Sequence, residues 1–248
     1  MTEHITSRQN PFCKHVKKLR ANRAYRYAQR LFLADGIKIV EEALRWADVE
    51  TVILREDVTV EGIPESVRTV IVPQGVMQEL SRMDTPQGAI AVCRMPAEET
   101  LALRAGSLIL DGIQDPGNLG TILRTADAFG IPVILADGCA DPYGEKTVRA
   151  SMGAVLRTKP VQAECGEILA RAKADRLPIC VTALTESARD IRKIDLRRCL
   201  TVIGSEGQGV RQTFLDAADE TAIIPMSERC ESLNAAVAAA IVLWEMAE

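Results

Sequence analysis

The 248-residue sequence contains few histidines, few aromatic residues and no long apolar run, and each shortage excludes a class of protein. A membrane-spanning helix needs roughly 18–20 consecutive apolar residues. The longest apolar run here is the ten residues 235–244, which is typical of a buried helix. The first ten residues, MTEHITSRQN, lack the apolar core of a secretory signal. We therefore expect a cytoplasmic protein that does not associate with a membrane.

Metal-binding and thiol-rich sites are also not indicated. The only histidines are His4 and His15, and the seven cysteines are scattered with no CxxC pair. No Cys/His set has the spacing of a zinc site, so we expect no metal. Neither histidine lies near a motif that suggests chemistry, which argues against histidine-dependent catalysis. Scattered, unpaired cysteines suit a reducing cytosol.

Charge is distributed unevenly along the chain. The net charge is −4, but residues 1–30 carry eight Lys/Arg and one Glu, a balance of +7 that leaves −11 for the rest. A basic arm on an acidic body predicts a local contact with phosphate, although a solvated helix face would have the same composition. Tyr25 and Tyr27 lie among the arginines and can either stack on bases or belong to the core.

The pattern of apolar residues predicts two α/β regions joined by a linker at 96–106. Residues 1–95 combine expected helices at 12–31, 36–47 and 74–82 with strands at 51–54, 69–72 and 89–92. Residues 107–248 contain expected strands at 107–110, 132–136, 155–161, 178–183, 200–203 and 221–224, separated by helices at about 119–129, 145–152, 164–175, 209–217 and 232–247. Short apolar strands separated by helices are typical of a parallel sheet covered on both faces. Binding sites in such sheets form at the carboxyl ends of the strands.

Two segments directly after expected strands have the composition of binding loops. In 111–130, DGIQDPGNLGTILRTADAFG, Asn118 can cap a helix beginning near Leu119, and Arg124 lies one to two turns inside it. In 201–210, TVIGSEGQGV, the glycines permit positive φ and close approach of a ligand to the backbone. The glycine spacing is neither that of a dinucleotide loop nor that of a P-loop. Glu206 would also repel a pyrophosphate.

A third segment, 223–244, reads IIPMSERCESLNAAVAAAIVLW. Ser232 or Asn234 begins an alanine-rich helix whose small side chains permit close packing. Taken singly, Ser232 and Asn234 fit simple helix caps, and Arg124 fits a surface ion pair.

In their order and spacing, the three segments resemble the SpoU (TrmH-like) family of RNA ribose 2′-O-methyltransferases. The matching residues are Asn118, Arg124 and Gly130, then Gly204-x-Glu206-Gly207-x-Gly209, then Ile224-Pro-Met226 with Glu231-Ser-Leu-Asn234. The segment RASMGAVLR at 149–157 is also similar to the family. The resemblance is strong over 107–248. It is weaker over 5–95, where SRQNPFCKHVKKL and TPQGAIAV look like the family's RNA-recognition domain.

The resemblance implies a SPOUT-type parallel sheet with a deep trefoil knot at 107–248, preceded at 1–95 by a small α/β, L30e-like RNA-binding domain. It implies S-adenosylmethionine as cofactor, RNA as substrate, a homodimer and no metal. Large-subunit ribosomal RNA is the preferred substrate and transfer RNA the second.

Residue roles follow from the same resemblance. The implied catalytic residues are Arg124, Asn118, Glu206, Ser232 and Asn234. The implied cofactor-binding residues are Thr182, Ala183, Leu184, Gly204, Glu206, Gly207, Ile224, Met226 and Leu233. The implied RNA-binding residues are Arg8, Lys14, Lys17, Lys18 and Arg124. We expect Arg124 to orient the 2′-hydroxyl and its phosphate. Its protonic role stays open, because a guanidinium with a pKa above about 12 is a poor base.

The third motif departs from the family at two positions, where Glu228 replaces a glycine and Cys230 a valine. This puts the shape of the loop, and with it the choice of substrate, in doubt. One alternative is therefore a catalytically degenerate RNA-binding member. Another is a Rossmann-type oxidoreductase, which would need a GxGxxG turn and a later acidic residue, and the sequence has neither. The target nucleotide cannot be read from the sequence.

Overall fold

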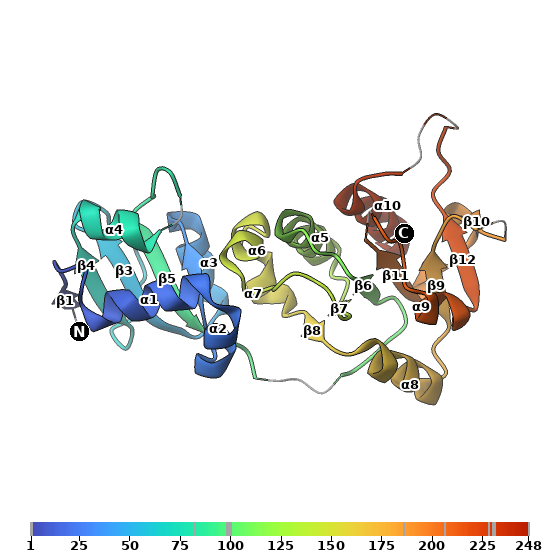
Figure 1. Ribbon diagram of the computed structural model, residues 1–248, viewed down its shortest axis with the longest axis horizontal. Coiled ribbons are helices and arrows are strands. Elements are labelled where there is room, and N and C mark those ends of the chain that lie inside the picture. Colours follow the sequence, from blue (N-terminus) through green and yellow to red (C-terminus); the bar gives the residue numbers. More distant parts are fainter. Residues whose placement is uncertain are drawn as a thin grey trace. The chain divides into compact units, whose positions relative to one another are not determined.

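The computed structural model describes residues 2–81, 83–97, 101–185, 187–205, 207–227, 229 and 232–247 (Figure 1). The chain forms two compact units, one made of Met1–Ala97 with Asp141–Arg157 and the other of Glu98–Ala140 with Thr158–Glu248. The boundaries expected from the sequence, 1–95, 96–106 and 107–248, follow the motifs and place 141–157 in the C-terminal part. They stay a prediction.

The first unit is built on a mixed five-stranded sheet with the order β1-β4-β3-β5-β2. Its strands are β1 (Thr2–His4), β2 (Leu31–Asp35), β3 (Val49–Arg55), β4 (Arg68–Val72) and β5 (Ala89–Arg94). Strand β5 runs antiparallel to both β2 and β3, whereas β4 runs parallel to β1 and β3. The helices of this unit are α1 (Pro11–Ala21), α2 (Arg23–Gln29), α3 (Ile37–Trp46), α4 (Gln74–Leu80), α6 (Glu145–Ala150) and α7 (Ala154–Thr158).

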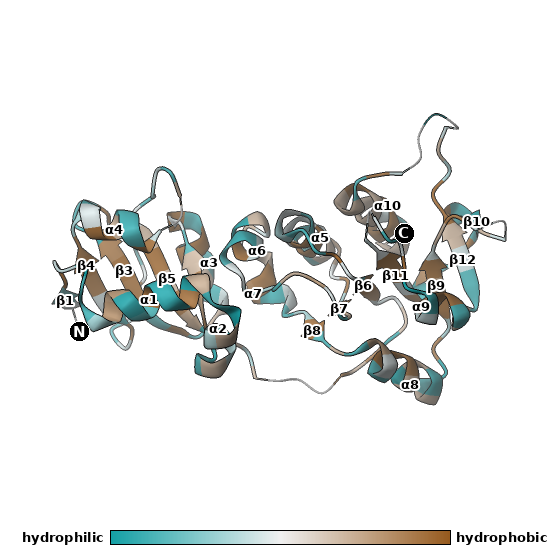
Figure 2. Cartoon of the chain, in the orientation of Figure 1, coloured by the Kyte–Doolittle hydropathy of each residue, from teal (hydrophilic) through white to brown (hydrophobic). Residues whose placement is uncertain are grey.

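The core of the first unit lies where the apolar faces of α1 and α4 cover the sheet. Val16, Leu19, Ile53, Val70 and Met77 are buried together there. In Figure 2 the strands of this sheet are mostly hydrophobic, and the helices also carry hydrophilic residues. The strands expected at 51–54, 69–72 and 89–92 are confirmed, because they lie within β3, β4 and β5.

The single helix expected at 12–31 is wrong. Asn22 ends α1 and begins α2, and its side-chain oxygen accepts a hydrogen bond from the backbone N–H of Tyr25 at 2.9 Å. The chain then enters β2, whose five residues are all buried. A strand buried on both faces shows no alternation of polar and apolar residues, so periodicity could not separate it from the preceding helix.

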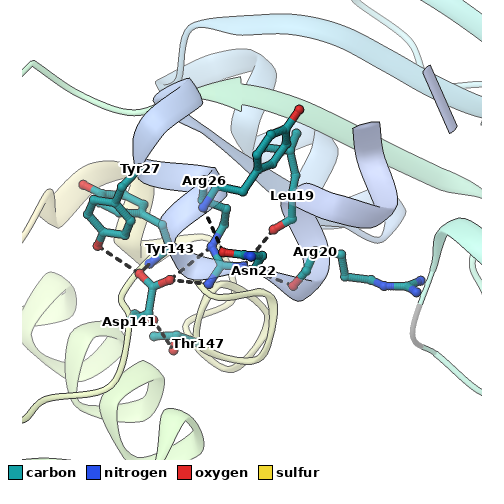
Figure 3. Close-up of polar contacts among 9 residues, drawn as sticks. Leu19, Arg20, Asn22, Arg26, Tyr27, Asp141, Tyr143 and Thr147 are labelled. Carbon is teal, nitrogen blue, oxygen red and sulfur yellow. Dashed lines mark hydrogen bonds and ion pairs between the residues drawn. The ribbon is translucent and has the colours of Figure 1, made fainter. Parts of the chain in front are cut away.

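The segment 141–157 returns to the first unit through a buried ion pair. Arg26 Nη2 lies 2.5 Å from Asp141 Oδ2, and both side chains are about nine-tenths buried, at 8% and 10% exposure. Tyr27 Oη donates to Asp141 Oδ1 at 3.0 Å, and Arg26 also donates to the carbonyl oxygen of Leu19 at 2.7 Å (Figure 3). Helix α6 packs against β2. These contacts make 141–157 part of the first unit.

The second unit contains a seven-stranded sheet with the order β10-β12-β9-β11-β6-β7-β8. Its strands are β6 (Leu108–Asp111), β7 (Val133–Leu135), β8 (Val161–Gln162), β9 (Ile179–Thr182), β10 (Arg189–Asp190), β11 (Leu200–Gly204) and β12 (Glu220–Ile223). Every pairing in it is parallel, which confirms the predicted α/β class with a parallel sheet. The strand expected at 155–161 is wrong, because α7 occupies most of that range and β8 has only two residues.

Helices α5 (Pro116–Phe129), α8 (Cys165–Asp175), α9 (Gln212–Asp216) and α10 (Ala235–Ala247) accompany this sheet. Helix α5 begins earlier than expected. Asp115 caps it by accepting a hydrogen bond from the backbone N–H of Asn118 at 2.8 Å, and Pro116 occupies the first helical position. The expectation that Asn118 caps this helix is therefore wrong, and its side-chain oxygen accepts a hydrogen bond from Asn234. No helix among the described residues is long and apolar enough to span a membrane.

Candidate active site

A pocket opens where the carboxyl ends of β9, β11 and β12 meet in the second unit. It holds about 770 Å³ of empty space, including its open mouth. Its lining residues are Thr182, Ala183, Leu184, Ile203, Gly204, Ser205, Gly209, Ala222, Ile223, Ile224, Met226, Ser232, Leu233, Ala235 and Ala238. Seven of the residues expected to bind the cofactor are among them: Thr182, Ala183, Leu184, Gly204, Ile224, Met226 and Leu233. Glu206 lies outside the described residues.

The glycine-rich loop folds tightly back against the end of its own strand. Ser205 N donates to the Gly209 carbonyl at 3.2 Å, and Gly209 N donates to the Ser205 carbonyl at 2.9 Å. A Cβ added at Gly204 would lie 2.2 Å from the backbone C and O of Gly209. Because neither neighbour is a flexible side chain, only glycine fits at 204. The loop therefore presents backbone edges to the pocket.

The pocket lining is mostly apolar and small. Thr182 is a polar exception, and its hydroxyl donates to the carbonyl oxygen of Val202 at 3.0 Å. Alanines from the first turns of α10 form one side of the pocket. An apolar slot edged by backbone N–H and C=O groups suits a flat heterocycle that is held by main-chain hydrogen bonds.

A second hollow adjoins the pocket and shares Ser205 and Ala235 with it. It has about 690 Å³ of empty space and is lined by Ile113, Gln114, Asp115, Asn118, Ser205, Gly207, Gln208 and Ala235. Gly207, which we expected at the cofactor, lies in this hollow. The turn after β6 and the loop after β11 therefore form one continuous edge with the pocket.

Asn118 and Asn234 come together at this edge. Asn234 Nδ2 donates to Asn118 Oδ1 at 3.1 Å. The other end of the Asn234 side chain accepts from the backbone N–H of Ala236 at 3.0 Å and of Val237 at 3.3 Å, so it caps α10. The interpretation of Asn234 as a helix cap is confirmed, and its role as a site residue stays a prediction.

Arg124 lies on a different face of α5 from Asn118. Successive helical residues are rotated by about 100°, so Arg124, six positions after Asn118, lies about 240° around α5 from it. The Arg124 side chain is exposed, and Arg124 is not one of the described residues that line the two hollows. A single chain therefore does not bring Arg124 to the pocket.

The residues expected to bind RNA at the N-terminus lie on and beside α1. Arg8 and Lys17 both pair with Glu79, at 3.1 Å and 2.8 Å, and the Lys17 hydrogen bond holds the pKa of Glu79 below its usual value. The Lys18 ammonium lies 4.6 Å from the centre of the Tyr25 ring. Lys14 is exposed. Lys14 and Lys18 therefore reach solvent more freely than Lys17, which is half-buried.

Histidine and cysteine provide no obvious catalytic group in the described parts of the chain. His15 Nδ1 lies 2.9 Å from the Tyr25 hydroxyl, and burial lowers the pKa of His15. Cys139 follows β7, and burial raises the pKa of its thiol to about 11. Across the described ranges no three His, Cys, Asp or Glu side chains converge as metal ligands would. Cys230 and Glu228 lie outside the described residues.

Comparison with known families identifies both parts of the chain. Residues 106–244 match the SpoU rRNA Methylase family, and residues 10–91 match the MRM3-like substrate binding domain. The chain belongs to the SpoU rRNA methylase family. The family expected from the three motifs is confirmed.

Relatives match most of the chain. The chain is 35% identical to the 23S rRNA (guanosine(2553)-2′-O)-methyltransferase RlmP of Bacillus subtilis, over 98% of this chain and 99% of the relative. It is 33% identical to a 23S rRNA (uridine(2479)-2′-O)-methyltransferase of Streptomyces viridochromogenes, over 70% of this chain and 64% of the relative. The crystal structure of an AdoMet-bound rRNA methyltransferase from Sinorhizobium meliloti superposes with a TM-score of 0.87 at 28% identity, over 99% and 97% of the two chains.

Sequence reasoning missed several pocket residues. Ser205, Ala235 and Ala238 line the pocket. Of these three, only Ser205 has a polar side chain, so the two alanines gave no chemical sign of a binding role. The available signal was the run of alanines from 235, which was interpreted only as a means of close packing. Asp111 and Arg211 were also missed as a pair, because they lie 100 residues apart.

Proposed function

We propose that the protein transfers a methyl group from S-adenosylmethionine to a ribose 2′-hydroxyl of large-subunit ribosomal RNA. The observation that carries this proposal is the pocket at the ends of β9, β11 and β12, which the second and third motif segments of a SpoU sequence enclose. The first motif segment lines the adjoining hollow. Two relatives named as 23S rRNA 2′-O-methyltransferases support the substrate class.

The residues present fit S-adenosylmethionine. Gly204 lets the backbone of Gly209 pack directly against the end of β11, and the apolar lining with its backbone edges suits an adenosyl group. Thr182, Ala183, Leu184, Gly204, Ile224, Met226 and Leu233 would hold the cofactor, with Glu206 and Gly207 from the same loop. When bound, the cofactor supplies an electrophilic methyl group on a sulfonium sulfur. The AdoMet-bound structural relative supports this assignment.

The hollow beside the pocket is where we place the target nucleotide. Asn118 and Asn234 meet at its edge, and Ser232 lines the neighbouring pocket. In-line placement of the hydroxyl and removal of its proton are the two tasks of the site. We assign placement to Asn118, Ser232, Asn234 and Glu206, and orientation of the 2′-hydroxyl with its phosphate to Arg124.

A second copy of the chain would complete this site. Apart from Glu245, helix α10 consists of apolar residues, and Val237 and Trp244 are exposed by 50% and 53%. The Trp244 ring contacts Phe129 at the end of α5, the helix that carries Arg124. A helix without a polar face requires cover on every side. We therefore propose a homodimer in which this face is buried and Arg124 reaches the partner's pocket.

The course of the chain supports the trefoil knot that the resemblance implies. In the sheet, β9 lies between β11 and β12. The chain nevertheless returns from β12 to α10, which packs against α5 and β11. On this return from β12 to α10, the described residues Ile224, Met226, Ser232 and Leu233 line the pocket at the ends of β9, β11 and β12. We propose that this return is the threaded part of the knot.

The first unit is the proposed RNA-recognition domain. The MRM3-like match supports this role, and we keep the L30e-like assignment as part of the proposal. Arg8, Lys14, Lys17 and Lys18 are the basic residues we assign to RNA. A cytoplasmic location is proposed with the RNA substrate, and the six described cysteines are all free thiols.

One experiment decides both the RNA class and the target base of the substrate. One relative is named for a guanosine and the other for a uridine, so relatives do not predict the target base. Transfer RNA is the second candidate class. Labelled S-adenosylmethionine should be incubated with bulk ribosomal and transfer RNA from cells lacking the gene, using wild type and Arg124→Ala in parallel.

We expect label in 2′-O-methylnucleosides of 23S ribosomal RNA with the wild type and none with Arg124→Ala, while both bind the cofactor equally. Label in transfer RNA alone would contradict the ribosomal substrate. Cofactor binding without label in either RNA would favour a degenerate RNA-binding member and make Glu228 the next residue to replace.

A further inference from the structure

Both ends of the glycine-rich loop contact the same residue, Asp111. Strand β11 leaves the sheet at Gly204, which is paired with Asp111 in the parallel register with β6. Seven residues later the backbone N–H of Arg211 donates to Asp111 Oδ2 at 2.8 Å, and Arg211 Nε donates to Asp111 Oδ1 at 2.6 Å. Asp111 thus holds both ends of this loop, one through the backbone pairing with Gly204 and the other through the charged contact with Arg211.

The contact between Asp111 and Arg211 is partly shielded from water. The Asp111 side chain is 3% exposed and the Arg211 side chain is 32% exposed. The hydrogen bond that Arg211 donates to the Asp111 carboxylate raises the pKa of Arg211. Charge-assisted hydrogen bonds of this length are stronger and more directional than neutral ones. The pair is therefore suited to hold geometry and not only to balance charge.

Arg211 also joins two further parts of the second unit. Its Nη1 donates to Asp137 Oδ2 at 3.2 Å and its Nη2 to the Asp137 carbonyl at 2.6 Å. Asp137 Oδ2 accepts the backbone N–H of Cys165, the first residue of α8, at 2.9 Å. One guanidinium thus connects the end of β6, the segment after β7 and, through Asp137, the start of α8.

The closed loop forms part of both hollows. Ser205 and Gly209 line the pocket, and Gly207 and Gln208 line the neighbouring hollow. On the other side, Asp111 leads directly into the turn that carries Ile113, Gln114 and Asn118. Because the loop contains two glycines between Ser205 and Val210, it has little intrinsic stiffness. Its shape therefore depends on the hydrogen bonds between Ser205 and Gly209 and on its anchors.

We infer that Asp111 and Arg211 are positioning residues for cofactor binding: they hold the loop 205–210 in the shape that receives the adenosyl group and in register with the Asn118 turn. Neither side chain lines the pocket among the described residues, so they act through the loop. This inference rests on the proposed function. It adds a residue pair that the motif analysis did not assign.

The test compares Arg211→Met and Arg211→Lys with wild type and with Arg171→Met. Arg171 is an exposed arginine that pairs with Asp175 on α8, so it controls for loss of an arginine in the same unit. Calorimetry measures binding of S-adenosylmethionine and of S-adenosylhomocysteine. Amide hydrogen exchange measures the opening of residues 205–210, and thermal unfolding measures stability.

We expect Arg211→Met to weaken the affinity for both cofactor forms by about tenfold or more, because an unanchored loop must be ordered on binding. Exchange of the loop amides should rise. Arg211→Lys should recover part of the affinity, because an ammonium can meet Asp111 but cannot also span to Asp137. Arg171→Met should bind like wild type.

Wild-type cofactor affinity in Arg211→Met, with or without a lower melting temperature, would overturn the inference and leave the pair as a structural clamp. Failure of the wild type itself to bind S-adenosylmethionine would instead overturn the proposed function. If Arg211→Met does not fold, Asp111→Asn decides the matter, since its amide oxygen still accepts from Arg211 but carries no charge. A loss of affinity in that folded variant supports the inference, and no loss overturns it.

Discussion

The amide nitrogen of Asn234 lies 3.1 Å from the amide oxygen of Asn118, although 116 residues separate them in the chain. This hydrogen bond joins the start of α10 to the first turn of α5, and so connects the third sequence motif to the first. The same Asn234 side chain caps α10 through its oxygen. Its two roles can be separated by substitution.

Asn234→Ser should keep the cap and lose the contact with Asn118, because the serine hydroxyl caps well but is too short to span to α5. Asn234→Ala should lose both. We expect methyl transfer to fall equally in the two variants, by about tenfold or more, while only Asn234→Ala loses about 1 kcal/mol of stability. Single-turnover kinetics and urea unfolding measure the two effects. Wild-type turnover in Asn234→Ser would refute a role for the contact.

Gly204→Ala should abolish cofactor binding or lower its affinity by about tenfold or more, since the added methyl group can be accommodated only if the loop moves. Its Cβ would lie 2.2 Å from backbone atoms of Gly209. The matched control is Gly166→Ala in α8, where a Cβ meets nothing within 4 Å. That control should bind normally and be slightly more stable, because alanine favours a helix. If the two variants bind the cofactor with equal affinity, the loop moves to accommodate the methyl group and the prediction is wrong.

Asp141→Ala should destabilise the first unit strongly. Removing one partner of a buried ion pair costs about 3 kcal/mol or more, because the other charge stays buried, and Arg26 is 8% exposed in its side chain. Glu3→Ala removes an exposed partner of Arg68 in the same unit and should cost at most about 1 kcal/mol. Chemical unfolding of the full chain measures both. A cost for Asp141→Ala as small as that for Glu3→Ala would mean that the pair contributes little.

His15 should make the first unit less stable in acid. Burial lowers its pKa below the ordinary 6.5, against an opposing effect of Glu50. The unfolded chain therefore binds a proton more readily, so the stability is present above pH 6.5 and is lost as the pH falls through the lower, folded-state pKa. His15→Gln can keep a hydrogen bond to Tyr25 but cannot titrate.

The measurement is the urea midpoint of wild type and His15→Gln at pH 7.5 and pH 5.5. A Trp244→Phe background leaves Trp46 of α3 as the fluorescent reporter of the first unit. The wild type should lose more stability between the two pH values than His15→Gln does. Identical losses in the two proteins would show that His15 does not carry the effect.

Trp244→Glu should prevent the proposed homodimer. A carboxylate on the apolar, exposed face of α10 cannot be buried against a second copy without a large penalty. Sedimentation equilibrium should show a monomer, and methyl transfer should fall with it. Trp46→Glu is the matched control, because Trp46 is similarly exposed, at 54% against 53%, but lies in the first unit. A dimeric Trp244→Glu protein would place the interface elsewhere.

Much of the second unit was predictable because its signals are local. Buried parallel strands produce short apolar runs, as in 108–111 and 200–204, and each run is followed by glycines or helix-capping residues. The resemblance to the family singled out Thr182, Ala183, Leu184, Gly204, Ile224, Met226 and Leu233, and these residues line one pocket. Their binding of the cofactor stays a prediction. Strand β2 was missed because it follows α2 after the single residue Arg30, with no glycine or proline to mark the boundary.

The sequence by itself determined the α/β class with a parallel sheet, the family and the segments that form the site, because apolar periodicity and motif spacing are properties of neighbouring residues. The tertiary structure alone decided which distant residues meet. Asp141 joins Arg26, Arg211 returns to Asp111, and Asn234 reaches Asn118, each across about 100 residues or more. A burial pattern records that a side chain is covered, but the identity of the partner depends on how the strands are ordered in the sheet, and no local pattern encodes that order.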